Sequence, residues 1–409
     1  MKQTTRVIFL TLPLSMISMQ SLAVEPTPYI TESGIEVQPV LAASYQYNDN
    51  ITHVSEGEIP ISSPLLEVTP GLALKAERGE NIYELKYALT SGSYSDSKDD
   101  NYVDHKFASN NFLRFNLRHA FQFDYSYFYL HEDRGIGLAA GDEHSKAISE
   151  PLRYDSHQIN TIYVYGAEDA KGRIEASLGF SNRTYKNYRN ITGINAYQSS
   201  RFNDFDEMRY DFIFFYKVFP NSDLIFEVEK LDRRYDYVFE TSIEQDSDTH
   251  FLYAGAQWDI TGKTKGSVKL GYQDKQFKDS RREDFGGFSW RVALEWTPSE
   301  HSTVIFTTSQ VAKDPDQAGD YVNEKNYQAS WKHYWMPLIY TNFSLEKIDE
   351  DYTGDSRSED TLKTGATLGY DMKEWIDLSA SWKTEEKDST KATYSYDQDI
   401  WSIDANIAF

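Results

Sequence analysis

Apolar and polar residues alternate along most of the chain. In the last segment Trp401, Ile403, Ala405, Ile407 and Phe409 alternate with Ser402, Asp404, Asn406 and Ala408. A period of two residues is typical of a β-strand whose two faces meet different environments. Similar alternation occurs over residues 288–296, 376–383 and 121–129, and the last of these places only Phe and Tyr on one face. The pattern therefore predicts an all-β protein.

Eighteen such segments are separated by turn or loop residues. They span residues 35–52, 65–77, 81–95, 104–118, 121–134, 152–167, 173–188, 202–218, 223–238, 249–260, 263–279, 285–297, 302–312, 322–335, 338–352, 361–370, 376–388 and 396–409. The two weakest segments are 65–77, which contains Pro70, and 361–370. If both were loops, a barrel of sixteen strands would be the alternative.

The connections distinguish a membrane barrel from a soluble β-sandwich, which shows the same alternation. Every second connection is short, at residues 78–80, 118–119, 168–172, 220–221, 261–262, 298–301, 336–337 and 371–375. The connections between them are longer and polar, as at residues 48–64, 133–151, 187–201, 314–320 and 349–360. Tight periplasmic turns that alternate with long extracellular loops are typical of outer-membrane barrels. We therefore predict a transmembrane antiparallel β-barrel of about eighteen strands over residues 35–409.

The N-terminus has the pattern of a secretory signal. Lys2 and Arg6 precede an apolar run from Val7 to Met16, and small residues near Ala23 suit cleavage. The run is shorter than the ~20 residues of a membrane-spanning helix, which disfavours an uncleaved anchor. We predict a signal peptide over residues 1–23 that is cleaved after Ala23, and a short periplasmic segment over 24–34. The predicted location is the outer membrane of a Gram-negative cell.

The composition supports a barrel and excludes one class of partner. The chain contains 30 Tyr, 23 Phe and 8 Trp, yet its mean hydropathy is −0.62. Strands that alternate lipid-facing and lumen-facing residues, with aromatic girdles at both interfaces, produce this combination. The net charge of −23 argues against nucleic acid, which requires a basic surface. Cysteine is absent, which fits an oxidising compartment in which no disulfide is needed.

Three parts of the sequence resemble a known family. They are residues 34–39, the stretch Tyr-Gln-Tyr-Asn-Asp-Asn-Ile at 45–51, and the aromatic end of the last strand at Phe409. Phe409 is similar to the C-terminal signal that the barrel-assembly machinery recognises. The whole layout resembles a family of β-barrel porins found among capsule and exopolysaccharide genes. The resemblance implies a polysaccharide-export conduit that works with periplasmic polysaccharide-export proteins, surrounded by outer-membrane lipid and lipopolysaccharide.

Charged residues on the inner face of the strands are the candidates for contact with a transported molecule. They are Glu84, Lys86, Arg114, Asp124, Arg173, Glu175, Arg209, Asp211, Lys217, Glu227, Glu229, Lys269, Arg291, Glu295, Lys383 and Asp404. A water-filled lumen can solvate or pair these side chains without burying them in hydrocarbon. Tyr340 and Tyr396 lie near strand ends, where they could serve as interface anchors or as faces for sugar rings.

Three functions follow, in order of preference. The first is a conduit that exports an exopolysaccharide or capsular polysaccharide chain. The alternative is a general diffusion porin or small-solute channel. An outer-membrane hydrolase is third, because no Ser–His or Asp–His constellation stands out by its spacing. We expect no catalytic residues, metal or cofactor.

Overall fold

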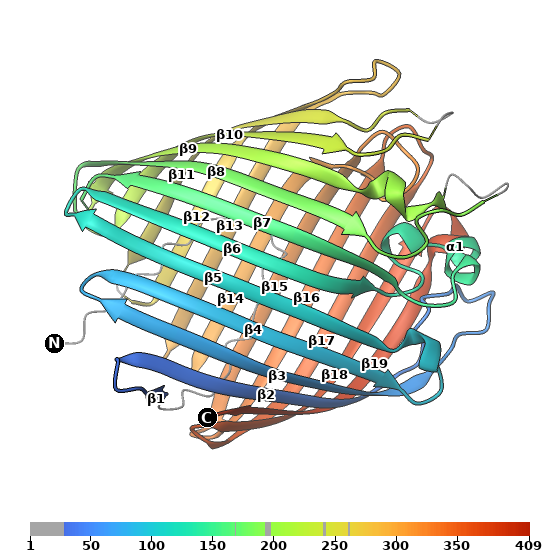
Figure 1. The fold of residues 1–409 in the computed structure, drawn as a ribbon, viewed down its shortest axis with the longest axis horizontal. Helices are drawn as coiled ribbons and strands as arrows, with labels where there is room; N and C mark the ends of the chain where they lie inside the picture. The colour runs from blue at the N-terminus through green and yellow to red at the C-terminus, as the bar shows by residue number, and fades with distance from the viewer. Residues whose placement is uncertain (1–27, 168, 193–197, 240–242, 261) are drawn as a thin grey trace.

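The chain forms one closed ring of strands (Figure 1). The computed structural model describes residues 28–167, 169–192, 198–239, 243–260 and 262–409. Its strands are β1 Tyr29–Ile30, β2 Ile35–Asn48, β3 Ser63–Arg78, β4 Asn81–Tyr94, β5 Tyr102–Asn116, β6 His119–Glu132, β7 Leu152–Tyr165, β8 Gly172–Tyr185, β9 Phe205–Phe219, β10 Ser222–Tyr235, β11 Ser247–Ile260, β12 Thr264–Phe277, β13 Phe285–Ser299, β14 Ser302–Lys313, β15 Val322–Met336, β16 Ile339–Tyr352, β17 Ser358–Lys373, β18 Ile376–Ser389 and β19 Tyr396–Ala408.

Helical structure is limited to short pieces in the connections. These are η1 Lys98–Asp100, η2 Gly137–Ala139, α1 Asp142–Ala147, η4 Ser200–Asn203 and η5 Ala392–Tyr394. No described helix has the length and apolar character needed to cross a bilayer.

Each strand from β2 to β19 pairs antiparallel with its neighbour in the chain, and β19 pairs with β2 to close the ring. The predicted eighteen-strand barrel is confirmed. The sixteen-strand alternative is wrong, because β3 and β17 are both full members of the sheet. Pro70 lies where the β3–β4 ladder is interrupted, at Thr69 and Pro70, while the β2–β3 ladder continues through the Leu41–Pro70 pair. There the Thr69 hydroxyl donates to the Thr90 hydroxyl at 3.0 Å instead.

The two ends of the barrel differ as the sequence predicts. The connections that carry α1 and the other helical pieces all lie at one end, and the tight turns lie at the other (Figure 1). Phe409 lies at the turn end, where its N–H donates to the Pro39 carbonyl at 2.9 Å and its ring stacks on Trp375. Its role in assembly stays a prediction. The described part of the N-terminal segment folds back, and Tyr29 pairs with Val37 of β2. The predicted signal peptide and its cleavage site lie outside the described residues.

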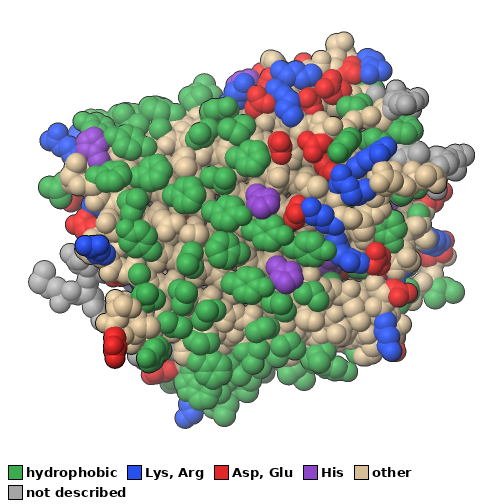
Figure 2. Space-filling view, viewed as in Figure 1, with side chains coloured by type: hydrophobic (Ala, Val, Ile, Leu, Met, Phe, Trp, Pro, Cys, Tyr) green, Lys and Arg blue, Asp and Glu red, His purple; other side chains and the backbone are tan. Residues whose placement is uncertain are grey.

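The outer face of the barrel is apolar. Ile403 is 69% exposed, Leu252 is 62% exposed and Leu368 is 57% exposed, although all three lie in the middle of strands. Hydrophobic side chains spread over the wall in Figure 2, and charged side chains gather toward the loop end. An exposed apolar band around a closed barrel is the surface that faces lipid. Tyr340 and Tyr396 do not belong to it: both are buried, and their hydroxyls donate to Asp377 and Glu385. Their interpretation as interface anchors is wrong, because both fall on the inner phase of their strands.

Candidate functional site: the lumen and its mouth

The predicted inner residues all lie on the lumen phase of their strands, and the fold brings seven of them into one group. We call this group the inner ion network, and it consists of Arg173, Glu175, Arg209, Glu227, Glu229, Lys269 and Arg291. They come from β8, β9, β10, β12 and β13, which are consecutive in the ring except for β11 between them. Strand register, and not sequence proximity, assembles them.

The carboxylates of Glu227 and Glu229 are the centre of this network. Lys269 Nζ lies 2.5 Å from Glu227 Oε2, and Arg291 Nη1 lies 2.8 Å from Glu229 Oε2. The exposed fraction of both glutamates is 1% or less. A buried carboxylate loses its hydration, so it is tolerated only when opposite charges compensate for that loss. The network therefore holds the wall between β8 and β13 together and leaves few of its charges available to a solute.

Two aromatic residues in this wall were missed by the sequence analysis. Phe251 and Tyr253 on β11 are buried on the inner face, where a polar residue is expected. The guanidinium of Arg291 lies 4.8 Å from the Phe251 ring centroid and 4.9 Å from the Tyr253 ring centroid. A cation over an aromatic face is attracted by the ring quadrupole. The sequence signal is the pair Phe251 and Tyr253 in the middle of the inner phase of β11, whose one charge, Asp259, lies at the turn end, between two strands rich in inner charges.

The other predicted residues form local pairs or none. Lys86 binds Glu84 at 2.9 Å, Arg114 binds Glu80 at 2.8 Å and Lys217 binds Asp169 at 3.0 Å. Glu295 lies 3.8 Å from Lys265. Asp404 accepts hydrogen bonds from Ser44 and Ser402, and Asp124 accepts one from Gln122. Asp211 is buried beside the inner ion network. These residues line the lumen without converging on one point.

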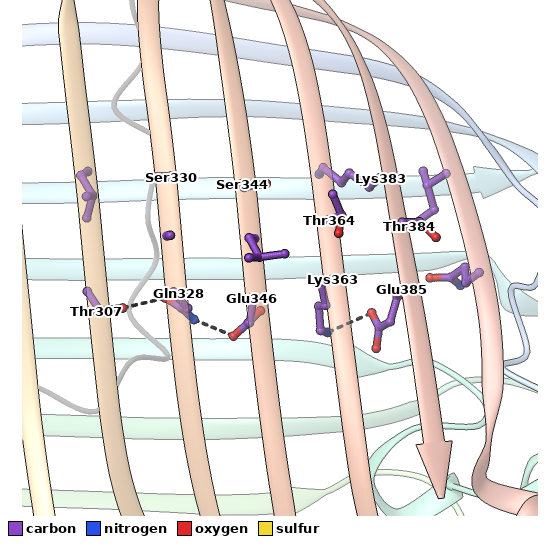
Figure 3. A pocket seen from close by; sticks show the side chains of 15 residues that line it. Thr307, Gln328, Ser330, Ser344, Glu346, Lys363, Thr364, Lys383, Thr384 and Glu385 are labelled. Carbon is purple, nitrogen blue, oxygen red and sulfur yellow. Dashed lines mark hydrogen bonds and ion pairs between the residues drawn. The ribbon is translucent and has the colours of Figure 1, made fainter.

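The next part of the ring, from β14 to β19, is hollowed on its inner face. A cavity of about 590 Å³ lies against it, and two inner rows of side chains line most of it. The first row crosses six strands as Thr307, Gln328, Glu346, Lys363, Glu385 and Gln398. The second row, one step closer to the turn end, is Ile305, Ser330, Ser344, Gly365, Lys383 and Ile400. Hydroxyl, amide and charged groups face the lumen here (Figure 3).

The loop over residues 133–151 extends across the mouth of the barrel. Its α1 segment is bound to the β2–β3 loop, because Asp142 accepts hydrogen bonds from the Ser55 N–H and hydroxyl at 2.9 and 2.7 Å. Gly135 has a φ of 87°, and a Cβ there would lie 2.1 Å from the Thr52 carbonyl oxygen. Only glycine fits that backbone contact. The loop is therefore held in place by close packing as well as by hydrogen bonds.

The far side of the mouth holds the same loop. The Gln317 side-chain amide, in the β14–β15 loop, donates to the carbonyls of Leu138 and Ala140 at 3.0 and 2.9 Å. The Tyr394 hydroxyl donates to Gln317 Oε1 at 2.9 Å. In the ring of eighteen strands, the eight strands β7 to β14 separate the β6–β7 loop from the β14–β15 loop. The two loops therefore start from nearly opposite walls. We call the structure formed by residues 133–151 and Gln317 the mouth arch.

A second ion cluster connects the β14–β15 loop to the wall below it. Asp314 Oδ1 lies 2.6 Å from Lys275 Nζ, and Asp314 Oδ2 lies 2.9 Å from Arg233 Nη1. Burial alone would raise the pKa of Asp314, but the charges of Lys275 and Arg233 outweigh it and lower the pKa to about 2. Asp314 thus holds the loop that carries Gln317.

We expect this cluster to make barrel stability acid-dependent. A carboxylate with a depressed pKa contributes stability above its unfolded pKa of 3.8 and loses it as the pH falls toward about 2. The contribution is about 2 kcal/mol at neutral pH. Asp314→Asn should therefore unfold more easily at pH 7 and differ little from the wild type near pH 2, as measured by urea unfolding at both pH values. An equal difference at both pH values would show that the charge of Asp314 is not responsible.

His131 does not have the geometry of a catalytic general base. Its Nδ1 lies 2.9 Å from Asp104 and its Nε2 lies 3.3 Å from Asp133, while Tyr102 stacks on the ring at 3.6 Å. A general base needs one ring nitrogen free to accept a proton from a nucleophile. Carboxylates face both nitrogens, so this geometry is that of an ion-paired histidine at a strand end. Among the residues that the structure describes, no group of three or more His, Asp or Glu side chains is arranged to hold a metal ion.

Comparison with known families agrees with this architecture. The model of the family described as "Putative beta-barrel porin 2" matches residues 35–409, which is the whole barrel. The chain belongs to this family. The family resemblance expected from the sequence is thereby confirmed, and the barrel is that of an outer-membrane porin. The family description names no polysaccharide and no export system.

Three solved outer-membrane proteins to which the chain is similar are distant in sequence. The outer membrane protein OpdK of Pseudomonas aeruginosa is 9% identical, with 91% of this chain and 99% of that chain covered at a TM-score of 0.49. OccAB4 of Acinetobacter baumannii is 10% identical, with 92% and 98% covered at a TM-score of 0.48. A ferric enterobactin receptor of P. aeruginosa, PfeA, is 8% identical, with 91% and 80% covered at 0.47. No curated protein sequence matches the chain.

Proposed function

We propose that this porin is a channel for small hydrophilic solutes across the outer membrane. The observation that carries the proposal is the mouth arch, which connects nearly opposite walls through Gln317 and the 138–140 carbonyls. A polysaccharide would have to break that connection and keep it broken while the whole polymer passes. A small molecule needs only the space beside it.

The cavity on the β14–β19 wall supports the same function. Its volume of about 590 Å³ falls within the range of small-molecule sites. Its lining offers hydroxyl and amide groups that can replace the hydrogen bonds a polar solute makes with water. The charges of the β8–β13 wall are paired in the inner ion network, so the β14–β19 wall is the side that a solute contacts.

Export of a polysaccharide, our first expectation from the sequence, is less well supported. The family description covers a porin in general, and the mouth arch obstructs a wide path. The polysaccharide chain, the periplasmic export proteins and the assembly machinery stay predictions as partners.

Planar-bilayer recording tests the proposal. Purified barrel should give stepwise potassium chloride currents without any other protein, and vesicles that contain it should swell in isosmotic glucose faster than in a glucose oligomer. Absence of both current and swelling would refute the proposal. Equal swelling in glucose and in long oligomers would favour a wide conduit instead.

A further inference from the structure

The cavity on the β14–β19 wall contains one cation whose charge is not used by the protein. Lys383 lies in the second inner row, is exposed to the lumen, and has no hydrogen bond or ion pair within the described part of the chain. In Figure 3 dashed lines connect the other charged side chains to neighbours, whereas Lys383 has none. Its ammonium carries three N–H donors directed by a flexible stem. It is therefore available to a ligand.

The other charged groups of the cavity already have partners, although Glu346 is bound by amides and by no cation among the described residues. Lys363 Nζ lies 2.9 Å from Glu385 Oε2. Glu346 Oε1 accepts hydrogen bonds from the amides of Asn326 at 2.8 Å and Gln328 at 2.6 Å. Glu346 therefore keeps its second oxygen as an acceptor for a ligand hydroxyl, while Lys383 supplies the free positive charge.

Small side chains give a ligand access to Lys383. Gly365 lies next to Lys383 across the β17–β18 ladder, and Ser344 and Ser330 follow on β16 and β15. A Cβ on Gly365 would lie 2.5 Å from the Ser344 hydroxyl oxygen and 3.7 Å from Lys383 Cγ. The Ser344 hydroxyl therefore occupies the space over Gly365, and the part of the cavity beside Lys383 is bordered by the Ser330 and Ser344 hydroxyls; we call this part the recess.

We propose that this recess is a binding site for hydroxylated monocarboxylates, such as sugar acids, with the carboxylate on Lys383 and the hydroxyls on Ser330, Ser344 and Glu346. The inference rests on the proposed channel function and specifies its solute class. A neutral sugar would leave the ammonium unmatched, and a cationic sugar would be repelled by it. A charge-assisted hydrogen bond to Lys383 distinguishes the acid from both.

Single-channel current block by three related sugars tests the site. Glucuronate, glucose and glucosamine share a ring and carry a negative, a zero and a positive charge, so they separate charge from shape. The wild type should bind glucuronate roughly tenfold or more tighter than glucose. Lys383→Gln should abolish that difference without changing glucose block, and Lys383→Arg should keep it. Gly365→Ala should weaken glucuronate and glucose together, because its Cβ would displace the Ser344 hydroxyl.

Lys86→Gln is the matched control, because it removes the same charge from the lumen at a lysine that Glu84 already pairs. It should leave glucuronate block as in the wild type. Equal block by glucuronate and glucose in the wild type, or equal effects of Lys383→Gln and Lys86→Gln, would overturn the proposal. Either result would be obtained from a conducting channel, whereas failure of the channel function would appear as absence of current in potassium chloride alone.

Discussion

Replacing residues 136–147 by a short Gly-Ser turn should raise the single-channel conductance severalfold. This segment carries η2 and α1 and forms the part of the mouth arch that lies between opposite walls. It contains none of the β-strands, so its removal leaves every pairing of the barrel intact. Single-channel recording in potassium chloride measures the effect directly. Unchanged conductance in the shortened protein would show that the mouth arch does not limit ion flow.

Gln317→Ala is a milder version of the same experiment. It removes the amide that donates to the Leu138 and Ala140 carbonyls. Loss of hydrogen bonds of this kind costs about 1–3 kcal/mol. That loss would raise the population of the state in which the arch is detached from the β14–β15 loop by roughly 5- to 150-fold. We therefore expect brief transitions to the larger conductance rather than a constant increase. Gln276→Ala is the matched control, because Gln276 is exposed and its amide donates to Asp274 on its own strand.

The sequence was sufficient to predict the barrel because its evidence is local. Alternation over a few residues identifies a strand, and connection length identifies the end of the barrel to which it leads. The strand from Ser358 to Lys373 is longer than its predicted range of 361–370, and it starts earlier because Ser358, Glu359 and Asp360 are polar on both faces. The alternation ends before the hydrogen-bonded ladder does.

The same alternation places a residue such as Glu227 inside the barrel but does not identify its partner. Lys269 is 42 residues away from Glu227 in sequence, and the two meet only because β10, β11 and β12 pair in one particular register. Shifting one pairing by a single residue would place one of them in lipid. Pairing in the lumen is therefore a property of the closed ring.

The mouth arch could not be predicted for a different reason. Gln317 and Ala140 are 177 residues apart and both lie in irregular segments, where no periodic pattern constrains position. The only sequence signal near the contact is the glycine content of the loop, at Gly135, Gly137 and Gly141. All three have positive φ values, so the backbone path requires them.

The largest effect on stability is expected from Lys269→Met, which should reduce the free energy of unfolding by about 3–5 kcal/mol. Methionine keeps most of the side-chain volume but removes the ammonium 2.5 Å from Glu227, a carboxylate with an exposed fraction of 0%. Arg291 Nη1, at 3.4 Å from Glu227, compensates only in part because it also binds Glu229. Urea unfolding in detergent micelles or lipid vesicles measures the loss.

Two further variants decide whether the cost comes from an uncompensated buried charge. Adding Glu227→Gln to Lys269→Met removes that charge and should recover a large part of the lost stability, since a neutral amide is cheaper to bury than a carboxylate. Lys86→Met removes a lysine paired with Glu84, but the two side chains are 35% and 26% exposed, and the cost should stay within about 1 kcal/mol. If Lys86→Met and Lys269→Met were equally destabilising, burial would not be the source of the effect. The inner ion network would then be a set of ordinary solvated pairs, and the β8–β13 wall would be as accessible to solutes as the wall that holds Lys383.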